Sequence, residues 1–115
     1  MILAAVDDLM FTSKISTAAR GLGVDVVFAR TAAETVDRAR TLAPSLIILD
    51  LDGRRTEPLA AVAALQNDPT LAKTRIVAFV RHTETDLIAR ATAAGIDDVM
   101  ARSAFVANLA DILKS

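Results

Sequence analysis

The sequence predicts a single α/β domain built on a doubly wound, five-stranded parallel sheet in the order 2-1-3-4-5. Five short apolar runs alternate with five stretches of helical periodicity, which is typical of βαβ units with right-handed crossovers. Aspartates close the first and third runs, as expected where neighbouring strands end at the switch point of such a sheet. The 115 residues can form one hydrophobic core and not two, so we expect one domain over residues 1–115.

The expected strands are the five apolar runs. The first, third and fourth are nearly continuous in apolar residues, which is typical of strands covered on both faces. The second contains Asp25 and the fifth is short and bounded by charged residues, so we expect both at the edges of the sheet. The five runs are Ile2–Val6, Val24–Phe28, Leu46–Leu49, Arg75–Val80 and Asp98–Ala101.

The expected helices follow these runs and carry start and stop signals. Ser, Thr and Asp can cap a helix start, proline can begin or stop a helix, and glycine commonly ends one. The last helix is expected to continue unbroken to the end of the chain. In chain order the signals are Gly23 after the first helix, Thr31 with Glu34 before the second and Pro44 after it, Pro58 before the third, Thr83 with Asp86 before the fourth and Gly95 after it, and Ser103 before the fifth, whose apolar stripe includes Val106 and Leu109.

Composition excludes several classes of function. The net charge of -1 gives no case for binding nucleic acid or an anionic membrane surface. No apolar stretch approaches the roughly 20 residues that a membrane-spanning helix needs. The absence of cysteine excludes disulfides, thiol catalysis and thiolate metal sites, and no basic segment with an apolar stretch precedes the first strand. We therefore expect a cytoplasmic protein with no membrane or nucleic-acid partner.

Three aspartates end the first and third expected strands. Asp7 and Asp8 follow the first strand, and Asp50 follows the third. Because these strands are expected to be parallel neighbours, the three carboxylates should converge in the crevice where open α/β sheets bind ligands. Such an acidic pocket suits a divalent cation, or a reaction that uses a carboxylate.

The chain resembles, over its whole length, the receiver domain of bacterial response regulators of the chemotaxis-regulator type. The pair Asp7-Asp8 matches the acidic pair after strand 1 of that family, and the segment from Pro44 to Asp50 matches the stretch that carries the phosphoacceptor. The segment from Ala94 to Asp98 matches the turn that leads into strand 5. The resemblance implies a flavodoxin-like receiver fold and a non-enzymatic role in two-component or phosphorelay signal transduction.

The resemblance also implies a role for each acidic residue. Asp50 would accept a phosphoryl group from the phosphohistidine of a histidine kinase. A Mg²⁺ ion would be held directly by Asp8 and Asp50, through water by Asp7, and by the backbone carbonyl of Asp52. An open pocket of this kind would bind Mg²⁺ weakly, because hard oxygen ligands suit the ion.

Four positions depart from the receiver pattern. Val80 stands where the family has the hydroxyl residue that binds the phosphoryl group, and Arg81 where it has a small residue. Val99 stands in place of the aromatic switch residue, and Arg102 in place of the lysine before a cis-proline. Valine cannot donate a hydrogen bond, and arginine has a broader head and a different reach from lysine. The chain is therefore similar to an atypical, or pseudo-receiver, version of the family.

Two mechanisms follow from this resemblance. In the first, Arg81 or Arg102 pairs with Asp50 and the domain acts by protein contact without phosphorylation. In the second, Asp50 is phosphorylated by a histidine kinase in a Mg²⁺-dependent manner and shifts a conformational equilibrium. In both, the expected interface is the family's output face, formed by helix 4, strand 5 and helix 5. No effector domain is expected beyond the last helix.

An enzyme from another class shares a short motif with this chain. Asp50 and Asp52 resemble the Asp-x-Asp motif of haloacid-dehalogenase-type phosphatases, and the segment from Gly95 to Asp98 resembles their later metal-binding motif. That family carries the motif on its first strand, whereas here it ends the third expected strand, which weighs against the phosphatase. The single histidine, His82, is expected in an exposed loop and not as a ligand or phosphocarrier.

Overall fold

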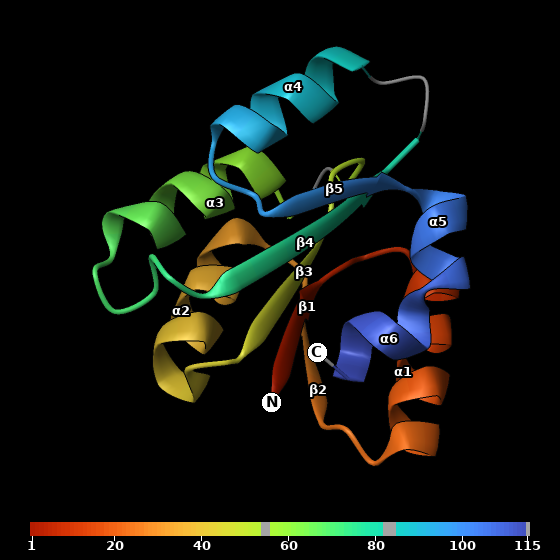
Figure 1. The fold of residues 1–115 in the computed structure, drawn as a ribbon. Coiled ribbons are helices and arrows are strands. Elements are labelled where there is room, and N and C mark those ends of the chain that lie inside the picture. The colour runs from red at the N-terminus through yellow and green to blue at the C-terminus, as the bar shows by residue number, and fades with distance from the viewer. Residues whose placement is uncertain (54–55, 82–84, 115) are drawn as a thin grey trace.

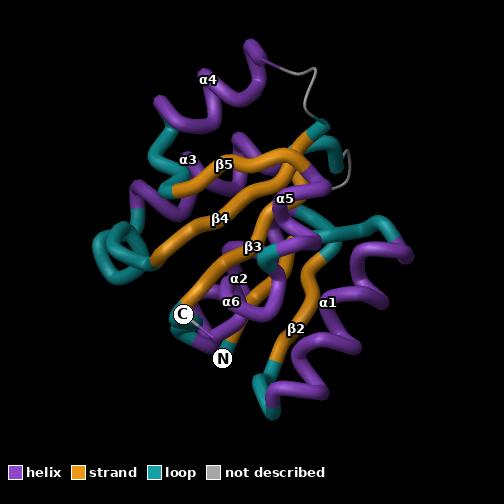
Figure 2. Tube along the Cα trace, turned by 45° about the vertical axis from the view of Figure 1, so that its right-hand side comes forward, coloured by secondary structure: helices purple, strands orange, loops and turns teal. Residues whose placement is uncertain are grey.

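The computed structural model describes residues 1–53, 56–81 and 85–114, and it shows a parallel sheet with helices on both faces (Figures 1 and 2). The strand order is β2-β1-β3-β4-β5, so the predicted doubly wound α/β fold is confirmed. The strands are β1 (Ile2–Ala5), β2 (Val26–Ala29), β3 (Leu46–Asp50), β4 (Arg75–Val80) and β5 (Asp98–Ala101). The helices are α1 (Leu9–Leu22), α2 (Ala32–Leu42), α3 (Pro58–Asn67), α4 (Thr85–Ala93), α5 (Arg102–Ala107) and α6 (Leu109–Lys114).

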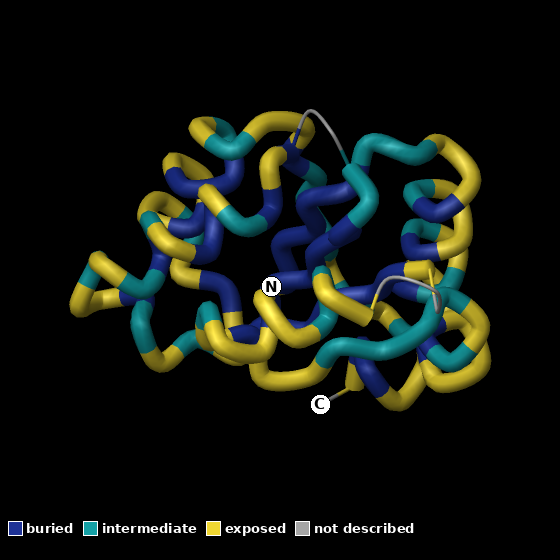
Figure 3. The backbone as a smooth tube through the Cα atoms, turned by 90° about the horizontal axis from the view of Figure 1, so that it is seen from above, coloured by how far each residue is buried: buried dark blue, intermediate teal, exposed yellow. Residues whose placement is uncertain are grey.

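Alternate residues of the inner strands pack into two hydrophobic cores, one on each face of the sheet. Leu3, Ile47 and Ile76 pack with buried residues of α2, α3 and α4 on one face. Ile48 and Phe79 pack with buried residues of α1, α5 and α6 on the other. β1 and β3 are buried along their length, and β4 is buried after its exposed first residue, Arg75. Figure 3 shows the buried segments in the interior and exposed segments around the outside of the molecule. This explains the continuous apolar sequence of the three inner strands.

The register of the sheet aligns the ends of the strands. Asp50 of β3 lies opposite Phe79 of β4, and Val80 of β4 lies opposite Ala101 of β5. Residues that follow the strands therefore leave the sheet at one edge. This is the edge at which the sequence predicts an acidic pocket.

Most of the predicted helix signals are confirmed. The amide of Glu34 donates to Thr31 Oγ1 at 3.1 Å, and Pro58 occupies the first turn of α3. Gly23 caps α1 in the left-handed conformation, with φ of 69°, which a residue without a side chain adopts at little cost. Thr83, the other predicted cap, lies outside the described residues, as does His82.

The structure corrects several predicted bounds. β1 ends at Ala5, not Val6, and β3 extends to Asp50, not Leu49. β2 spans Val26–Ala29, not Val24–Phe28, because the amide of Val24 still donates to the carbonyl of Ala19 in α1. The helix expected after Ser103 instead begins at Arg102 with no side-chain cap, and it is split at Asn108 into α5 and α6. The Asn108 side chain donates to the carbonyl of Ala104 at 2.8 Å, and its φ of -108° interrupts the helical path.

Two further features bear on function. Both predicted edge strands, β2 and β5, lie at the edges of the sheet. In the parts of the chain that the structure describes, no helix is long and apolar enough to cross a bilayer.

Candidate functional site

A polar pocket of about 640 Å³ opens at the carboxyl edge of the sheet. Residues at or just after the ends of all five strands line it: acids at the ends of β1 and β3, and an arginine directly after each of β2, β4 and β5. The position agrees with the rule that open α/β sheets bind ligands beyond the carboxyl ends of their strands. The lining residues are Asp7, Asp8, Leu9, Arg30, Asp50, Asp52, Gly53, Arg81 and Arg102.

Asp50 is the most enclosed acid of the pocket, with 2% of its surface exposed. Its Oδ1 accepts the amide of Asp52 at 2.9 Å and lies 3.8 Å from Arg102 Nη2. Burial raises the pKa of Asp50, the Asp52 amide and the Arg102 charge lower it less, and the charges of Asp52 and Asp7 add to the rise. The predicted acidic pocket therefore holds an aspartate whose ionised form is disfavoured.

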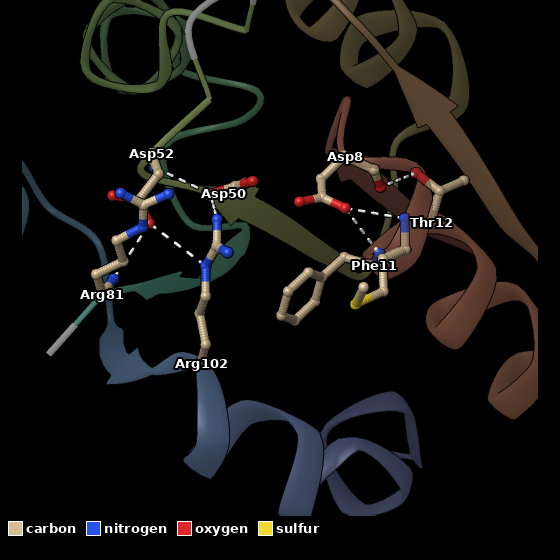
Figure 4. Close-up of polar contacts among 8 residues, drawn as sticks. Asp8, Phe11, Thr12, Asp50, Asp52, Arg81 and Arg102 are labelled. Atoms are coloured by element: carbon tan, nitrogen blue, oxygen red, sulfur yellow. Dashed lines mark hydrogen bonds and ion pairs between the residues drawn. The ribbon is translucent and has the colours of Figure 1, made fainter.

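Arg102 is the cation nearest to these acids. Its Nε lies 3.4 Å from Asp52 Oδ2, and the same guanidinium reaches Asp50 (Figure 4). The guanidinium also stands 5.0 Å from the centre of the Phe11 ring, in the range of a cation–π contact. Arg102 is thus held between two carboxylates and an aromatic ring, as the interpretation of an internally paired pocket requires.

The ring beneath Arg102 belongs to a cluster of three phenylalanines. Phe11 of α1 stacks on Phe79 of β4 with ring centres 4.6 Å apart, and Phe79 lies 4.5 Å from Phe105 of α5. All three are buried. The cluster holds in place the Phe11 ring that the Arg102 guanidinium contacts. Sequence periodicity gave no signal for it because the rings come from three separate elements.

Asp8 also caps a helix, a role that was not predicted from the sequence. Its Oδ1 accepts the amides of Met10 at 2.8 Å and Phe11 at 3.3 Å, which makes it the N-cap of α1 (Figure 4). Aspartate immediately before a helix is a common cap, so the signal was present in the sequence. One oxygen of Asp8, a predicted metal ligand, therefore already accepts two backbone hydrogen bonds.

Asp52 also contributes more than predicted. The resemblance implies only that the backbone carbonyl of Asp52 binds the metal. In the structure, the Asp52 side chain also contacts two groups of the pocket. Asp52 Oδ2 accepts the backbone amide of Arg81 at 3.1 Å and lies 3.4 Å from Arg102 Nε. This carboxylate therefore joins the ends of β3, β4 and β5.

Gly53 and Thr56 approach each other closely in the segment that follows β3. A β-carbon on Gly53 would lie 2.5 Å from Thr56 Oγ1 and 3.4 Å from Asp7 Oδ1, so only glycine allows this close approach. Thr56 is fully buried, and its hydroxyl has no hydrogen-bond partner among the described residues. No sequence pattern marked Thr56 as part of the site.

The oxygen chemistry of the pocket suits Mg²⁺, but the arrangement does not. Asp8 caps α1, and Asp50 Oδ1 is occupied by an amide and approached by a guanidinium. Within the described residues, no three acidic or histidine side chains are grouped so that they could hold a metal ion. Arg102 instead supplies positive charge beside Asp50. The assignment of Asp7, Asp8, Asp50 and Asp52 as metal ligands stays a prediction.

The four positions at which the sequence departs from the receiver pattern lie around this pocket or in the core behind it. Val80 is fully buried at the end of β4, and half-buried Val99 of β5 packs against the same core. Arg81 and Arg102 follow β4 and β5 directly into the pocket lining. Neither valine brings a hydroxyl or an aromatic ring to the site.

Solved structures share this fold. The phosphorylated cyanobacterial phytochrome response regulator RcpA is 24% identical with a TM-score of 0.81, over 98% of this chain and 87% of that one. The Vibrio cholerae chemotaxis regulator CheY4 is 18% identical with a TM-score of 0.82, over 97% of each chain. A Hahella chejuensis response regulator is 18% identical with a TM-score of 0.86, over 98% of this chain and 91% of that one.

These similarities concern the fold. No protein-family model matches the chain, and no curated protein matches it in sequence. The structural matches confirm the flavodoxin-like receiver fold that the sequence resemblance implies.

Proposed function

We propose that this chain is an atypical receiver-like domain that acts in two-component or phosphorelay signal transduction by protein contact, without phosphorylation of Asp50. Its fold is shared with response regulators, and its acidic pocket lies at the corresponding switch point of the sheet. The observation that carries the proposal is Arg102, which lies 3.8 Å from Asp50 and 3.4 Å from Asp52. An internal cation is therefore already paired with the two acids that phosphoryl transfer would use.

The pocket also lacks the groups that would hold a phosphoryl group. Charge that develops during phosphoryl transfer must be met by preorganised donors and cations. Val80 offers no hydroxyl there, and it is fully buried in an apolar core. Mg²⁺ binding in this proposal is weak or absent, since Asp8 already caps α1.

The proposed docking surface is the helix 4–strand 5–helix 5 face, formed here by α4, β5 and α5. β5 is an edge strand of the sheet, and its first residue, Asp98, is exposed on this face. The partner would be a protein of the signalling pathway, such as a histidine kinase. The near-neutral charge of the chain gives no support for a nucleic-acid or membrane partner.

A second candidate is an ordinary phosphoacceptor receiver in which Asp50 is phosphorylated. The open pocket and the arginines at its rim favour it, because positive charge stabilises a transferring phosphoryl group. The haloacid-dehalogenase-type phosphatase finds less support, since the motif formed by Asp50 and Asp52 ends the third strand of this sheet and not the first.

Incubation with acetyl phosphate and Mg²⁺, followed by intact mass measurement, separates the two candidates. The wild type should acquire little or no phosphoryl adduct. The double variant Val80→Thr with Arg102→Lys should acquire more, because it restores a hydroxyl donor and an ammonium group in the positions that the resemblance assigns to them. Adding Asp50→Asn to the double variant should remove the adduct. Stoichiometric labelling of the wild type would instead support the phosphoacceptor.

A further inference from the structure

Two N–H donors from different strands meet at one oxygen of Asp52. The backbone amide of Arg81, which follows β4, donates to Asp52 Oδ2 at 3.1 Å. The guanidinium of Arg102, which follows β5, places Nε 3.4 Å from the same oxygen. Figure 4 shows Asp52, Arg81 and Arg102 grouped on one side of Asp50, with Asp8 and its helix-start contacts on the other.

The two donors are not equally satisfied. The amide of Arg81 makes a hydrogen bond of ordinary length, whereas Arg102 Nε is buried and makes no well-formed hydrogen bond with the described residues. A buried donor left without a good acceptor costs free energy, so this position favours an anion that is better placed than Asp52. An oxyanion with several oxygens could reach both donors at hydrogen-bonding distance, which one carboxylate oxygen does not.

We propose that the carboxylate of Asp52 is the internal ligand of an oxyanion site formed by the Arg81 amide and the Arg102 guanidinium, and that it keeps external phosphate-class oxyanions out of the pocket. The inference deepens the proposed function and rests on it, because it names the group that occupies the pocket. Asp52 in this account is an autoinhibitory residue, and its removal exposes the site.

The charges of the pocket lining agree with this role. Four aspartates and three arginines line the pocket, so the wild-type lining carries one negative charge in excess. Replacing Asp52 by a neutral residue balances that charge and frees the two donors together. Asp7, Asp8 and Asp50 remain, so binding should be moderate and should weaken as salt screens the arginines.

Orthophosphate is the probe for this site, followed by NMR of the Arg81 amide and the Arg102 Nε–H. Wild-type signals should shift little at millimolar phosphate. Asp52→Ala should bind at least about tenfold more tightly, which corresponds to about 1.4 kcal/mol, with the largest shifts at these two groups. Asp52→Asn should lie between the two, because its side-chain oxygen still accepts the Arg81 amide. This isosteric variant also serves if Asp52→Ala folds poorly.

Two controls complete the experiment. Asp37→Asn changes the net charge equally on the exposed surface of α2 and should leave phosphate binding at the wild-type level. Adding Arg102→Ala to the Asp52→Ala variant should abolish the gain. Equal phosphate affinity in the wild type and in both Asp52 variants would overturn the proposal, as would a gain in Asp37→Asn. Orthophosphate is not an activated phosphoryl donor, so this outcome is independent of whether Asp50 can be phosphorylated.

Discussion

At the scale of single residues, the fold raises the pKa of the Asp50 carboxyl above its ordinary value. Burial raises its pKa more than the Asp52 amide and Arg102 lower it. Protonated Asp50 therefore contributes to the stability of the folded domain. This contribution is fully present below the ordinary aspartate pKa of about 3.9, and it is lost as the pH rises through the pKa of Asp50 in the folded state. Ionisation of Asp50 at neutral pH therefore destabilises the domain.

Asp50→Asn should accordingly stabilise the domain at pH 7, because asparagine has no charge to bury. We expect a gain on the order of 1 kcal/mol, or roughly 4 °C in melting temperature. The gap should narrow as the pH falls through the raised pKa of Asp50, and it should be closed below the ordinary aspartate pKa of about 3.9. Thermal melts of both proteins across this range measure the effect, and a lower melting temperature for Asp50→Asn at pH 7 would show that the Arg102 contact outweighs burial.

Strand order accounts for where the three predicted acids lie. Asp7, Asp8 and Asp50 line one pocket because β1 and β3 are parallel neighbours. Arg81 and Arg102, which line the same pocket, were singled out by the family resemblance, and the roles of all five residues stay predictions. The side-chain contacts of Asp52 and the buried hydroxyl of Thr56 could not be predicted, because both depend on the path of the loop after β3.

At the scale of elements, the start of α1 depends on a residue that the family resemblance assigns to metal binding. Asp8 accepts two amides of the first turn of α1. A lost N-cap typically costs about 1 kcal/mol, so Asp8→Ala should lower the melting temperature by roughly 4 °C in metal-free buffer. Asp8→Asn keeps the acceptor and removes the charge, and it should melt close to the wild type. Equal losses in both variants would contradict the capping role.

The elements themselves were predicted more reliably than their limits. Hydrophobic runs and helix caps located every strand and α1 to α4, because burial on one or both faces sets the spacing of apolar residues along each element. The split between α5 and α6 was missed, because Leu109 and Ile112 continue an apolar stripe across Asn108. The break is marked by a local contact, the bond from the Asn108 side chain to the carbonyl of Ala104 one turn earlier, and by the φ of -108° at Asn108.

At the scale of the whole molecule, two kinds of contact link the pocket to the proposed docking face. Arg102, the first residue of α5, lies beside Asp50 but is also paired with Asp52, so it has a partner whatever happens at Asp50. The second kind of contact is apolar. Val80 and half-buried Val99 pack in the core shared with α2, α3 and α4, and neither has a polar group that a phosphoryl oxygen could attract. A ligand shifts a conformational equilibrium only through different affinities for its two states. We therefore expect chemical events at Asp50 to leave the region from β5 to α6 largely unchanged.

Hydrogen exchange of the wild type with and without acetyl phosphate and Mg²⁺, with intact mass read from the same samples, tests this central claim most directly. The account predicts little phosphoryl adduct and unchanged amide protection over residues 97–114, even in any fraction that is labelled. Stoichiometric labelling of Asp50 together with large changes in protection over residues 97–114 would contradict it and establish a phosphorylation-driven switch.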